Sequence, residues 1–191
     1  MNRKQHRLEA MMMAKQKISL NPVYLDAETT GTGELDEIIE IAIVDYDGTI
    51  LIDSFVQPIG NISPEAYAIH GITNDVLNDA PTWVEVWHQV KDALQGRVVG
   101  IYNADFDIRM MQQTHQISGM DWHPPFTGNF CIMKLYAQFY GEWNPSARDY
   151  RWQKLDTARW QTNLKIPNSH RAKDDTLLAR ALLHYIAEQS S

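Results

Sequence analysis

Two acidic residues, Asp26 and Glu28, stand two positions apart at the end of the apolar segment PVYLDAE. Side chains two apart in a strand point to the same face of a sheet, so both carboxylates are expected to project together. Carboxylate oxygens placed so closely suit a hard divalent cation such as Mg²⁺ or Mn²⁺. Solvated loops also carry such pairs without any chemical role. The pair alone therefore leaves a metal site and an exposed loop both open.

Two other segments carry acidic residues that could join this pair. Asp107 ends the run NADFD, near the start of a predicted helix, where Asp105 or Asn103 could serve as the helix cap. Asp174 and Asp175 both fall within the apolar arc of an amphipathic C-terminal helix. A carboxylate on a core-facing stripe is costly unless it is paired or coordinates a metal. Helical phase does not decide between these last two acids.

A histidine precedes the C-terminal acids by a spacing that restricts its position. His170 lies five residues before Asp175. If both were helical, their side chains would diverge by roughly 140° around the axis and could not share a site. We therefore predict that His170 belongs to the loop IPNSH, from which it can reach the acids. An exposed loop histidine without a chemical role fits the same pattern.

The bulk composition is that of a globular protein. The 191 residues are 44% hydrophobic and 21% charged, with a formal net charge of −7 and one cysteine. The negative charge argues against a broad basic face that grips nucleic acid, but bound divalent cations reverse the charge locally. No apolar run approaches the roughly 18 residues of a membrane helix, and the N-terminal segment has no signal-peptide core. The expected location is the cytoplasm, with no membrane association.

The order of predicted elements indicates one α/β domain over residues 18–191, behind an N-terminal extension of residues 1–17 that is helical or disordered. Early strands followed by alternating helices and strands are typical of a mixed central sheet flanked by helices. Asp47-Gly48 predicts a hairpin, and Ser63 and Thr73 are candidate helix caps. The predicted strands cover residues 22–28, 38–48, 49–58 and 97–103. The predicted helices cover residues 63–71, 73–78, 83–96, 106–117, 131–140, 150–164 and 174–189.

Together, YLDAETTG, NADFD and HRAKDD resemble the three exonuclease motifs of the DnaQ-like (DEDDh) 3′–5′ exonucleases, in the family's order and separation. The resemblance covers the chain from Pro22 to its C-terminus, and ISPEAYAIHGIT is similar to the family's segment between the first two motifs. This family includes the proofreading subunit of bacterial DNA polymerase, exonuclease X and ribonuclease T. The resemblance implies an RNase H-like fold, in agreement with the order of elements.

The resemblance also implies roles for individual side chains. Its metal ligands match Asp26, Glu28, Asp107 and Asp175. The family's spacing selects Asp175 over Asp174, and the last position of NADFD selects Asp107 over Asp105. Two divalent ions, Mg²⁺ or Mn²⁺, would lie about 3.5–4 Å apart and clamp the scissile phosphate. His170 matches the general base that takes the proton of the attacking water.

Other positions match the family's substrate contacts less closely. Glu65 and His70 fall where family members touch the terminal nucleotide, although His70 could equally close a short helix ahead of Gly71. Tyr102 is a departure, because many members have histidine before the asparagine of the second motif. Aromatic side chains that could stack on unpaired bases are Tyr67, Phe106, Phe126 and Trp152.

These assignments predict a metal-dependent 3′–5′ exonuclease that acts on the 3′ end of single-stranded nucleic acid, with DNA as the favoured substrate, and releases nucleoside 5′-monophosphates. One alternative keeps the chemistry and changes the substrate, as in an RNA-trimming or oligoribonucleotide exoribonuclease. A second alternative is a non-catalytic interaction subunit that retains the fold. The sequence leaves a polymerase or repair partner, and a homodimer, open.

Overall fold

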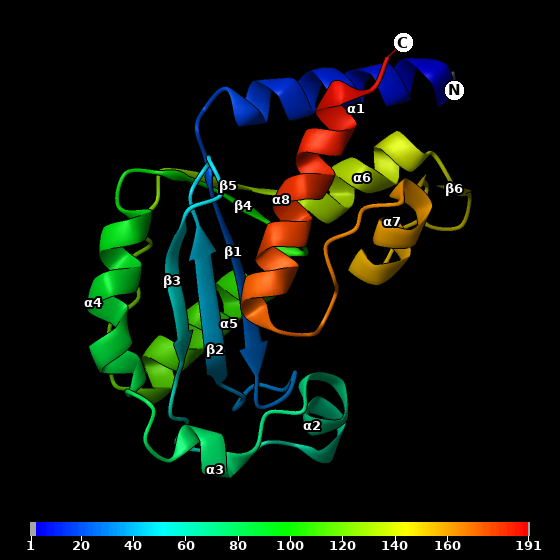
Figure 1. Cartoon of the computed structure of the whole chain (residues 1–191). Coiled ribbons are helices and arrows are strands. Elements are labelled where there is room, and N and C mark those ends of the chain that lie inside the picture. The colour runs from blue at the N-terminus through cyan, green and yellow to red at the C-terminus, as the bar shows by residue number, and fades with distance from the viewer. Residues whose placement is uncertain (1–2, 191) are drawn as a thin grey trace.

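The computed structural model describes residues 3–190, and a five-stranded sheet in the order β3-β2-β1-β4-β5 lies at their centre (Figure 1). β1 pairs antiparallel with β2 and parallel with β4, so the predicted mixed sheet is confirmed. β2 also pairs antiparallel with β3, and β4 pairs parallel with β5. The strands are β1 (Val23–Thr29), β2 (Ile38–Val44), β3 (Ile50–Phe55), β4 (Val98–Ile101) and β5 (Gly128–Cys131).

Helices cover both faces of the sheet and pack in two hydrophobic clusters. One face carries α4 (Trp83–Leu94) and α5 (Ala104–Ile117). The other carries α1 (Arg3–Ile18), α6 (Ile132–Tyr140), α7 (Leu155–Thr162) and α8 (Ala172–Glu188). The short helices α2 (Pro64–His70) and α3 (Asn74–Leu77) lie beyond the C-terminal end of β1 (Figure 1). None of the helices within residues 3–190 is long and apolar enough to cross a membrane.

The alternation of side chains along β1 decides which residues meet which layer. Leu25 and Ala27 pack in the cluster with α4 and α5, whereas Tyr24 packs in the cluster with α6 and α8. Because strand side chains alternate, Asp26 and Glu28 lie on the same face as Tyr24. The central strand therefore presents two carboxylates toward the helix that carries Asp175.

Residues 3–18 form the helix α1, which packs across α6 and α8. Ala10 and Ala14, four residues apart, are fully buried there, and Met11 is almost fully buried. Residues spaced by four lie on one face of a helix, and their small size brings the helix axes close together. α1 therefore shares a hydrophobic core with α8.

The structure departs from the predicted helix over residues 150–164. A two-stranded hairpin of β6 (Trp143–Asn144) and β7 (Asp149–Tyr150) comes first, and α7 begins only at Leu155. Between them, the hydroxyl group of Tyr102 donates to the carbonyl oxygen of Gln153 at 2.7 Å. That carbonyl is thereby satisfied by a side chain from β4's end, outside any helix. Tertiary hydrogen bonding has overridden the local helical pattern.

The remaining differences concern element boundaries. β5 is absent from the sequence prediction, because four residues give too little periodicity to detect. α5 and α8 each begin two residues earlier than predicted. Ser63 caps α2 as predicted, accepting from the amide of Ala66 at 3.1 Å, whereas Thr73 makes no side-chain cap bond. The hairpin at Asp47-Gly48 is confirmed, with Gly48 at φ 100°.

Three tryptophan side chains gather on the face of the sheet that α4 and α5 cover. Trp83, Trp87 and Trp122 surround the ring of His115, with centroid distances of 5.5, 4.1 and 4.8 Å. The other three tryptophans of the chain, Trp143, Trp152 and Trp160, are exposed. The six indoles thus fall into a clustered set and an exposed set.

Candidate active site

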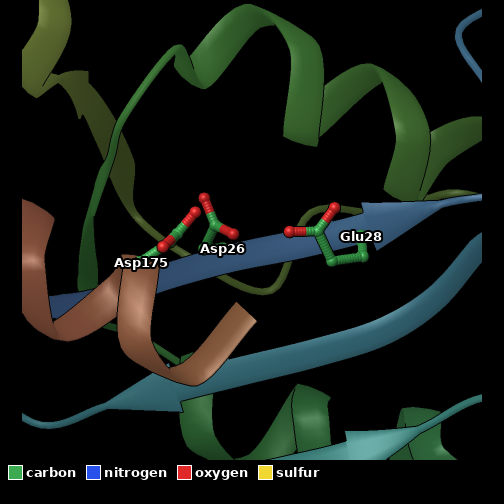
Figure 2. Close-up of side chains that lie close together, drawn as sticks. All are labelled: Asp26, Glu28 and Asp175. Carbon is green, nitrogen blue, oxygen red and sulfur yellow. The ribbon is translucent and has the colours of Figure 1, made fainter. Parts of the chain in front are cut away.

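Three of the predicted ligands come together between β1 and α8. Asp26 and Glu28 project from β1, and Asp175 lies in the first turn of α8 beside Asp26 (Figure 2). One carboxylate oxygen from each of the three lies within 4.8 Å of the others. The Oδ1 atom of Asp175 is buried and has no hydrogen-bond partner within the described residues. Clustered oxygens around an unsatisfied buried atom fit a hard divalent cation.

Asp107 lies beside this group, in the first turn of α5, and is 2% exposed. Among the neighbouring acids, Asp107 has the charge that raises the pKa of Asp26 most. It does not belong to the three-residue group that meets within 4.8 Å. Asp105 is exposed and pairs with Lys134 at 2.7 Å. The structure therefore places Asp107, and not Asp105, next to the predicted ligands.

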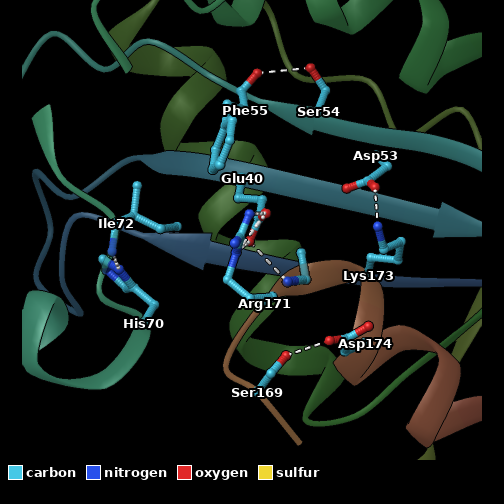
Figure 3. Close-up of polar contacts among 11 residues, drawn as sticks. Glu40, Asp53, Ser54, Phe55, His70, Ile72, Ser169, Arg171, Lys173 and Asp174 are labelled. Carbon is cyan, nitrogen blue, oxygen red and sulfur yellow. Dashed lines mark hydrogen bonds and ion pairs between the residues drawn. The ribbon is translucent and has the colours of Figure 1, made fainter. Parts of the chain in front are cut away.

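The two adjacent acids of α8 have different surroundings. Asp175 is 6% exposed and meets Asp26 and Glu28. Asp174 is half-buried and accepts a hydrogen bond from the hydroxyl group of Ser169 at 2.6 Å. Asp174 thus ties the preceding loop to the helix start (Figure 3). Of these two residues, only Asp175 points its carboxylate toward Asp26 and Glu28.

Burial and mutual repulsion raise the pKa values of all four acids. Burial, then the charges of Asp175 and Glu40, raises the pKa of Glu28 to about 8. Burial, then the charges of Asp174 and Glu40, raises the pKa of Asp175 to about 7. Burial is also the largest cause of the raised pKa values of Asp26 and Asp107. A divalent cation would remove the repulsion and favour the ionised carboxylates.

A buried ion pair, which the sequence analysis did not identify, anchors the start of α8. Glu40 of β2 is 2% exposed and lies opposite Glu28 in the β1–β2 register. Its Oε1 accepts from Arg171 Nη2 at 2.6 Å and from Nε at 3.0 Å (Figure 3). Its Oε2 accepts from the backbone amide of Ala172 at 3.0 Å. Glu40 thereby fixes the first turn of α8 against the sheet and positions Asp175.

His170 lies in the loop before α8, with φ 52°, next to a cavity of about 600 Å³. Asp26 and Asp175 line the same cavity. The left-handed backbone conformation is uncommon outside glycine, and such strain is often found at functional sites. The structure therefore brings His170 and two of the acids to one cavity.

A second cavity, of about 470 Å³, opens on the other side of the acids. Glu28 lines it together with Glu65, His70 and Phe106. His70 is held by the backbone, since Nδ1 accepts from the amide of Ile72 at 3.0 Å and Nε2 lies 3.2 Å from the carbonyl oxygen of Thr29. Burial lowers its pKa, which favours the neutral ring that this pattern requires. His70 both ends α2 and lines the cavity.

The loop after β1 forms the rim of this second cavity, and Asp36, another residue missed from sequence, shapes it. Its carboxylate accepts from the hydroxyl group of Thr30 at 2.7 Å and from the amide of Gly33 at 2.6 Å. A Cβ atom on Gly31 would lie 2.6 Å from an oxygen of Asp36. Glycine at position 31 therefore lets the loop close over the aspartate.

The other predicted stacking residues lie elsewhere. Phe126 packs against the hydrophobic core between the sheet and α4–α5, so its prediction as a base-stacking residue has no support from its position. Tyr67 is exposed on α2. Trp152 lines the cavity that holds His170.

Comparison with known proteins places this site in a family. The family model described as Exonuclease (RNase_T) matches residues 23–183. The Uncharacterized exonuclease CP81 of Escherichia phage 186 is 34% identical over 181 residues, covering 92% of each chain. The DNA polymerase III subunit epsilon of Escherichia coli K12 is 33% identical over 119 residues, covering 57% of this chain and 48% of that protein. The chain spans only 12% of the PolC-type DNA polymerase III of Thermotoga maritima.

Solved structures share the fold. Exonuclease X in complex with 5′ overhanging duplex DNA superposes with a TM-score of 0.61 and 26% identity, covering 85% of this chain and 89% of that chain. The nuclease domain of 3′hExo, a DEDDh family member bound to rAMP, has a TM-score of 0.67 and 20% identity, covering 84% and 88%. Both comparisons agree with the RNase H-like fold.

The match and the site together define the class of protein. The chain belongs to the exonuclease family, in its DnaQ-like (DEDDh) group, as the sequence motifs predicted. Members of this family are nucleases, which are hydrolases that act on nucleic acid. The phage 186 exonuclease is a relative of nearly the same length.

Proposed function

We propose that this protein is a 3′–5′ exonuclease that hydrolyses single-stranded DNA and releases nucleoside 5′-monophosphates. The observation that carries the proposal is the position of Asp26, Glu28 and Asp175, whose oxygens lie within 4.8 Å of one another between two cavities. One cavity can enclose a terminal nucleotide, since about 470 Å³ falls in the usual range of small-molecule sites. The acids then lie under the phosphate that joins this nucleotide to the strand.

The four acids would hold Mg²⁺ or Mn²⁺, two ions per site. When bound, these ions neutralise charge on the scissile phosphate and make water a better nucleophile. Asp26 and Glu28 act from the rigid central strand, and Asp107 and Asp175 act from the first turns of two helices on opposite faces of the sheet. Rigid supports keep the ligand geometry fixed through the reaction.

His170 takes a proton from the water that attacks phosphorus. The bond between phosphorus and the upstream 3′ oxygen breaks, the leaving oxygen takes a proton from solvent water, and the shortened strand leaves with a 3′ hydroxyl group. Histidine suits this proton transfer near neutral pH. On the other side, Glu65 and Phe106 would contact the sugar and base of the terminal nucleotide, next to the neutral ring of His70.

The preference for single strands has an electrostatic basis. The chain carries a net charge of −7, so it offers little attraction for a second phosphate backbone. An unpaired end can also stack its bases on aromatic side chains, whereas a duplex end must first separate. The proposal of DNA over RNA is supported by a relative that is a DNA polymerase subunit and by a structural neighbour, exonuclease X, in complex with 5′ overhanging duplex DNA.

The test uses the full chain with linear single strands that carry a 5′ or a 3′ label, in EDTA, Mg²⁺ or Mn²⁺. The 5′ label should report a descending ladder, and the 3′ label should appear at once in mononucleotide, only with a divalent ion. An RNA strand of the same sequence measures the sugar preference. Cleavage of a circular single strand, or shortening from the 5′ end, would overturn the proposal.

A further inference from the structure

The cavity that holds His170 has a second wall, which the proposed chemistry does not use. Asp26 and Asp175 lie on one side of this 600 Å³ space, and Trp152 and Lys154 also line it. Glu28 faces the other cavity, where the terminal nucleotide would sit. The acids therefore lie at the junction of two cavities. A strand whose last nucleotide occupies the first cavity can therefore place the preceding nucleotide in the second.

The segment that carries Trp152 and Lys154 is held in place by hydrogen bonds to the residue between them. Gln153, between them, is 8% exposed, and its carbonyl oxygen accepts from the buried hydroxyl group of Tyr102. The side-chain oxygen of Gln153 accepts from the amide of Gln161 at 3.3 Å. A buried, hydrogen-bonded residue therefore holds its two neighbours in place at the cavity wall.

Both flanking side chains are presented to solvent without partners. The indole of Trp152 is 55% exposed. Within the described residues, neither the Trp152 ring nor the Lys154 ammonium group takes part in a hydrogen bond, ion pair or ring contact. The exposed Trp160 differs, because its indole NH donates to Asp156 at 3.2 Å and Arg159 stacks over its ring. Trp152 and Lys154 therefore form an exposed aromatic and cationic surface on a backbone segment that Gln153 holds in place.

We propose that Trp152 and Lys154 form a binding subsite for the nucleotide immediately upstream of the scissile bond. Trp152 stacks on the base of that penultimate nucleotide, and Lys154 pairs with a phosphate on its 5′ side. Every base has a π face, so the contact is tolerant of sequence. Lys154 also supplies positive charge where a strongly acidic chain must hold a polyanion. The inference rests on the proposed function and adds a second nucleotide to its substrate site.

A double-mutant cycle between protein and substrate tests the stacking contact. Trp152→Ala should lower kcat/KM for release of the first nucleotide by about 5- to 150-fold, the range that one base stack provides. Removing the penultimate base from the strand should cost wild type a similar factor and should cost Trp152→Ala little more. Trp152→Phe should restore part of the loss. Trp160→Ala, the matched control, should behave as wild type.

The phosphate contact has its own readout. Lys154→Ala should reduce the slope of log Kd against log salt by about 0.7, the value for one phosphate in a single strand. Lys91→Ala, at an exposed position of α4, is the control and should leave the slope unchanged. Kd is measured by fluorescence anisotropy with a 5′-labelled strand in Ca²⁺.

The binding measurement separates the two proposals. If wild type binds the strand and Trp152→Ala binds it more weakly, but neither cleaves it with Mg²⁺ or Mn²⁺, the proposed function fails and only strand binding at Trp152 stands. If wild type digests the strand while Trp152→Ala has the same kcat/KM and Kd, the subsite is overturned and the function stands. The subsite would also be overturned if removal of the penultimate base lowered kcat/KM by the same factor in wild type and in Trp152→Ala.

Discussion

Neighbouring strands of the same sheet carry two kinds of acidic residue. On β2 and just before it, Glu40 and Glu37 are 2% and 3% exposed, and both are surrounded by donors. Glu37 accepts from the backbone amides of Ile59 and Gly60, the latter at 2.7 Å, and Glu40 accepts from Arg171. On β1, Asp26 and Glu28 face other acids, and none of the ion pairs within residues 3–190 includes them.

The difference separates structural carboxylates from the proposed metal ligands. A buried carboxylate that accepts enough hydrogen bonds is stabilised in its ionised form by the protein itself. The acids on β1 and α8 have raised pKa values, because burial and the charges of neighbouring acids outweigh the opposing charge of Arg171 near Glu28. They are destabilised until a cation arrives from outside. The following changes test this distinction, from the largest expected effect to the smallest.

Asp26→Asn should lower activity by about 10³-fold or more. A bound ion supplies several kcal/mol of transition-state stabilisation, and each 1.36 kcal/mol is tenfold in rate. The thermal midpoint of the metal-free variant should not fall, because the change removes repulsion. Single-turnover kinetics and calorimetry measure the two effects. Wild-type activity in this variant would remove Asp26 from the metal site.

Unlike Asp26→Asn, Glu40→Ala should cause a large loss of stability and a smaller loss of activity. Loss of a buried pair costs about 3–5 kcal/mol, and about 2–3 kcal/mol is expected here, because the Arg171 side chain is 42% exposed. Displacement of α8 should weaken metal binding by about 10- to 100-fold. Denaturant unfolding and titration with Mn²⁺ provide the measurements, with Glu188→Ala, exposed at the end of α8, as control. Unchanged stability would show that Glu40 does not anchor α8.

The pH dependence of stability should differ between Glu28→Gln and wild type. In the folded protein the pKa of Glu28 is about 8, against an ordinary value of 4.5. The folded state therefore binds more protons than the unfolded state between these values, and stability falls as pH rises from about 4.5 to 8. In EDTA at pH 8, Glu28→Gln should melt higher than wild type, by about 2–4 °C for each kcal/mol of repulsion removed.

The advantage of Glu28→Gln should shrink toward pH 5, where wild type is protonated. In saturating Mn²⁺ the difference in melting temperature should reverse, because metal binding then stabilises wild type more than Glu28→Gln. A constant difference in melting temperature across this pH range would contradict the raised pKa.

Asp105→Asn and Asp174→Asn should have the smallest effects. Asp105 forms an exposed pair with Lys134, worth about 0–1 kcal/mol. Asp174 accepts from Ser169 and adds its charge to those that raise the pKa of Asp175, but it does not join the acidic group. Both variants should stay within about threefold of wild-type activity in the labelled-strand assay. An inactive Asp174→Asn beside an active Asp175→Asn would shift the ligand assignment by one residue.

The acids of β1 could be predicted from sequence because Asp26 and Glu28 lie two residues apart in the same strand. Period-two alternation placed Asp26 and Glu28 on one face, and the motif spacing selected Asp107 and Asp175. The structure has brought Asp26, Glu28 and Asp175 together, with Asp107 beside Asp26. The mixed sheet was also predictable, because its long strands are rich in β-branched residues.

Other features depend on contacts between distant segments. Glu40 is a single charge in an otherwise apolar strand, which could have suggested a buried partner, but Arg171 lies 131 positions away. The segment 151–154 follows a helical pattern locally, and only its contacts with Tyr102 and Gln161 explain its conformation. The burial of α1 was equally hidden, because most of its apolar residues run consecutively from Ala10 to Ala14 and do not follow an amphipathic spacing.

The arrangement of the six tryptophans has an optical consequence. Trp83, Trp87 and Trp122 form a shielded cluster on one face of the sheet, while Trp143, Trp152 and Trp160 meet solvent. Indoles in apolar surroundings emit at shorter wavelengths than indoles in water, so the two sets divide the emission spectrum. The short-wavelength edge reports the integrity of the α4–α5 layer. The long-wavelength edge, which soluble iodide quenches, reports the three exposed indoles, Trp152 among them. One unlabelled sample can therefore follow unfolding and strand binding as separate signals.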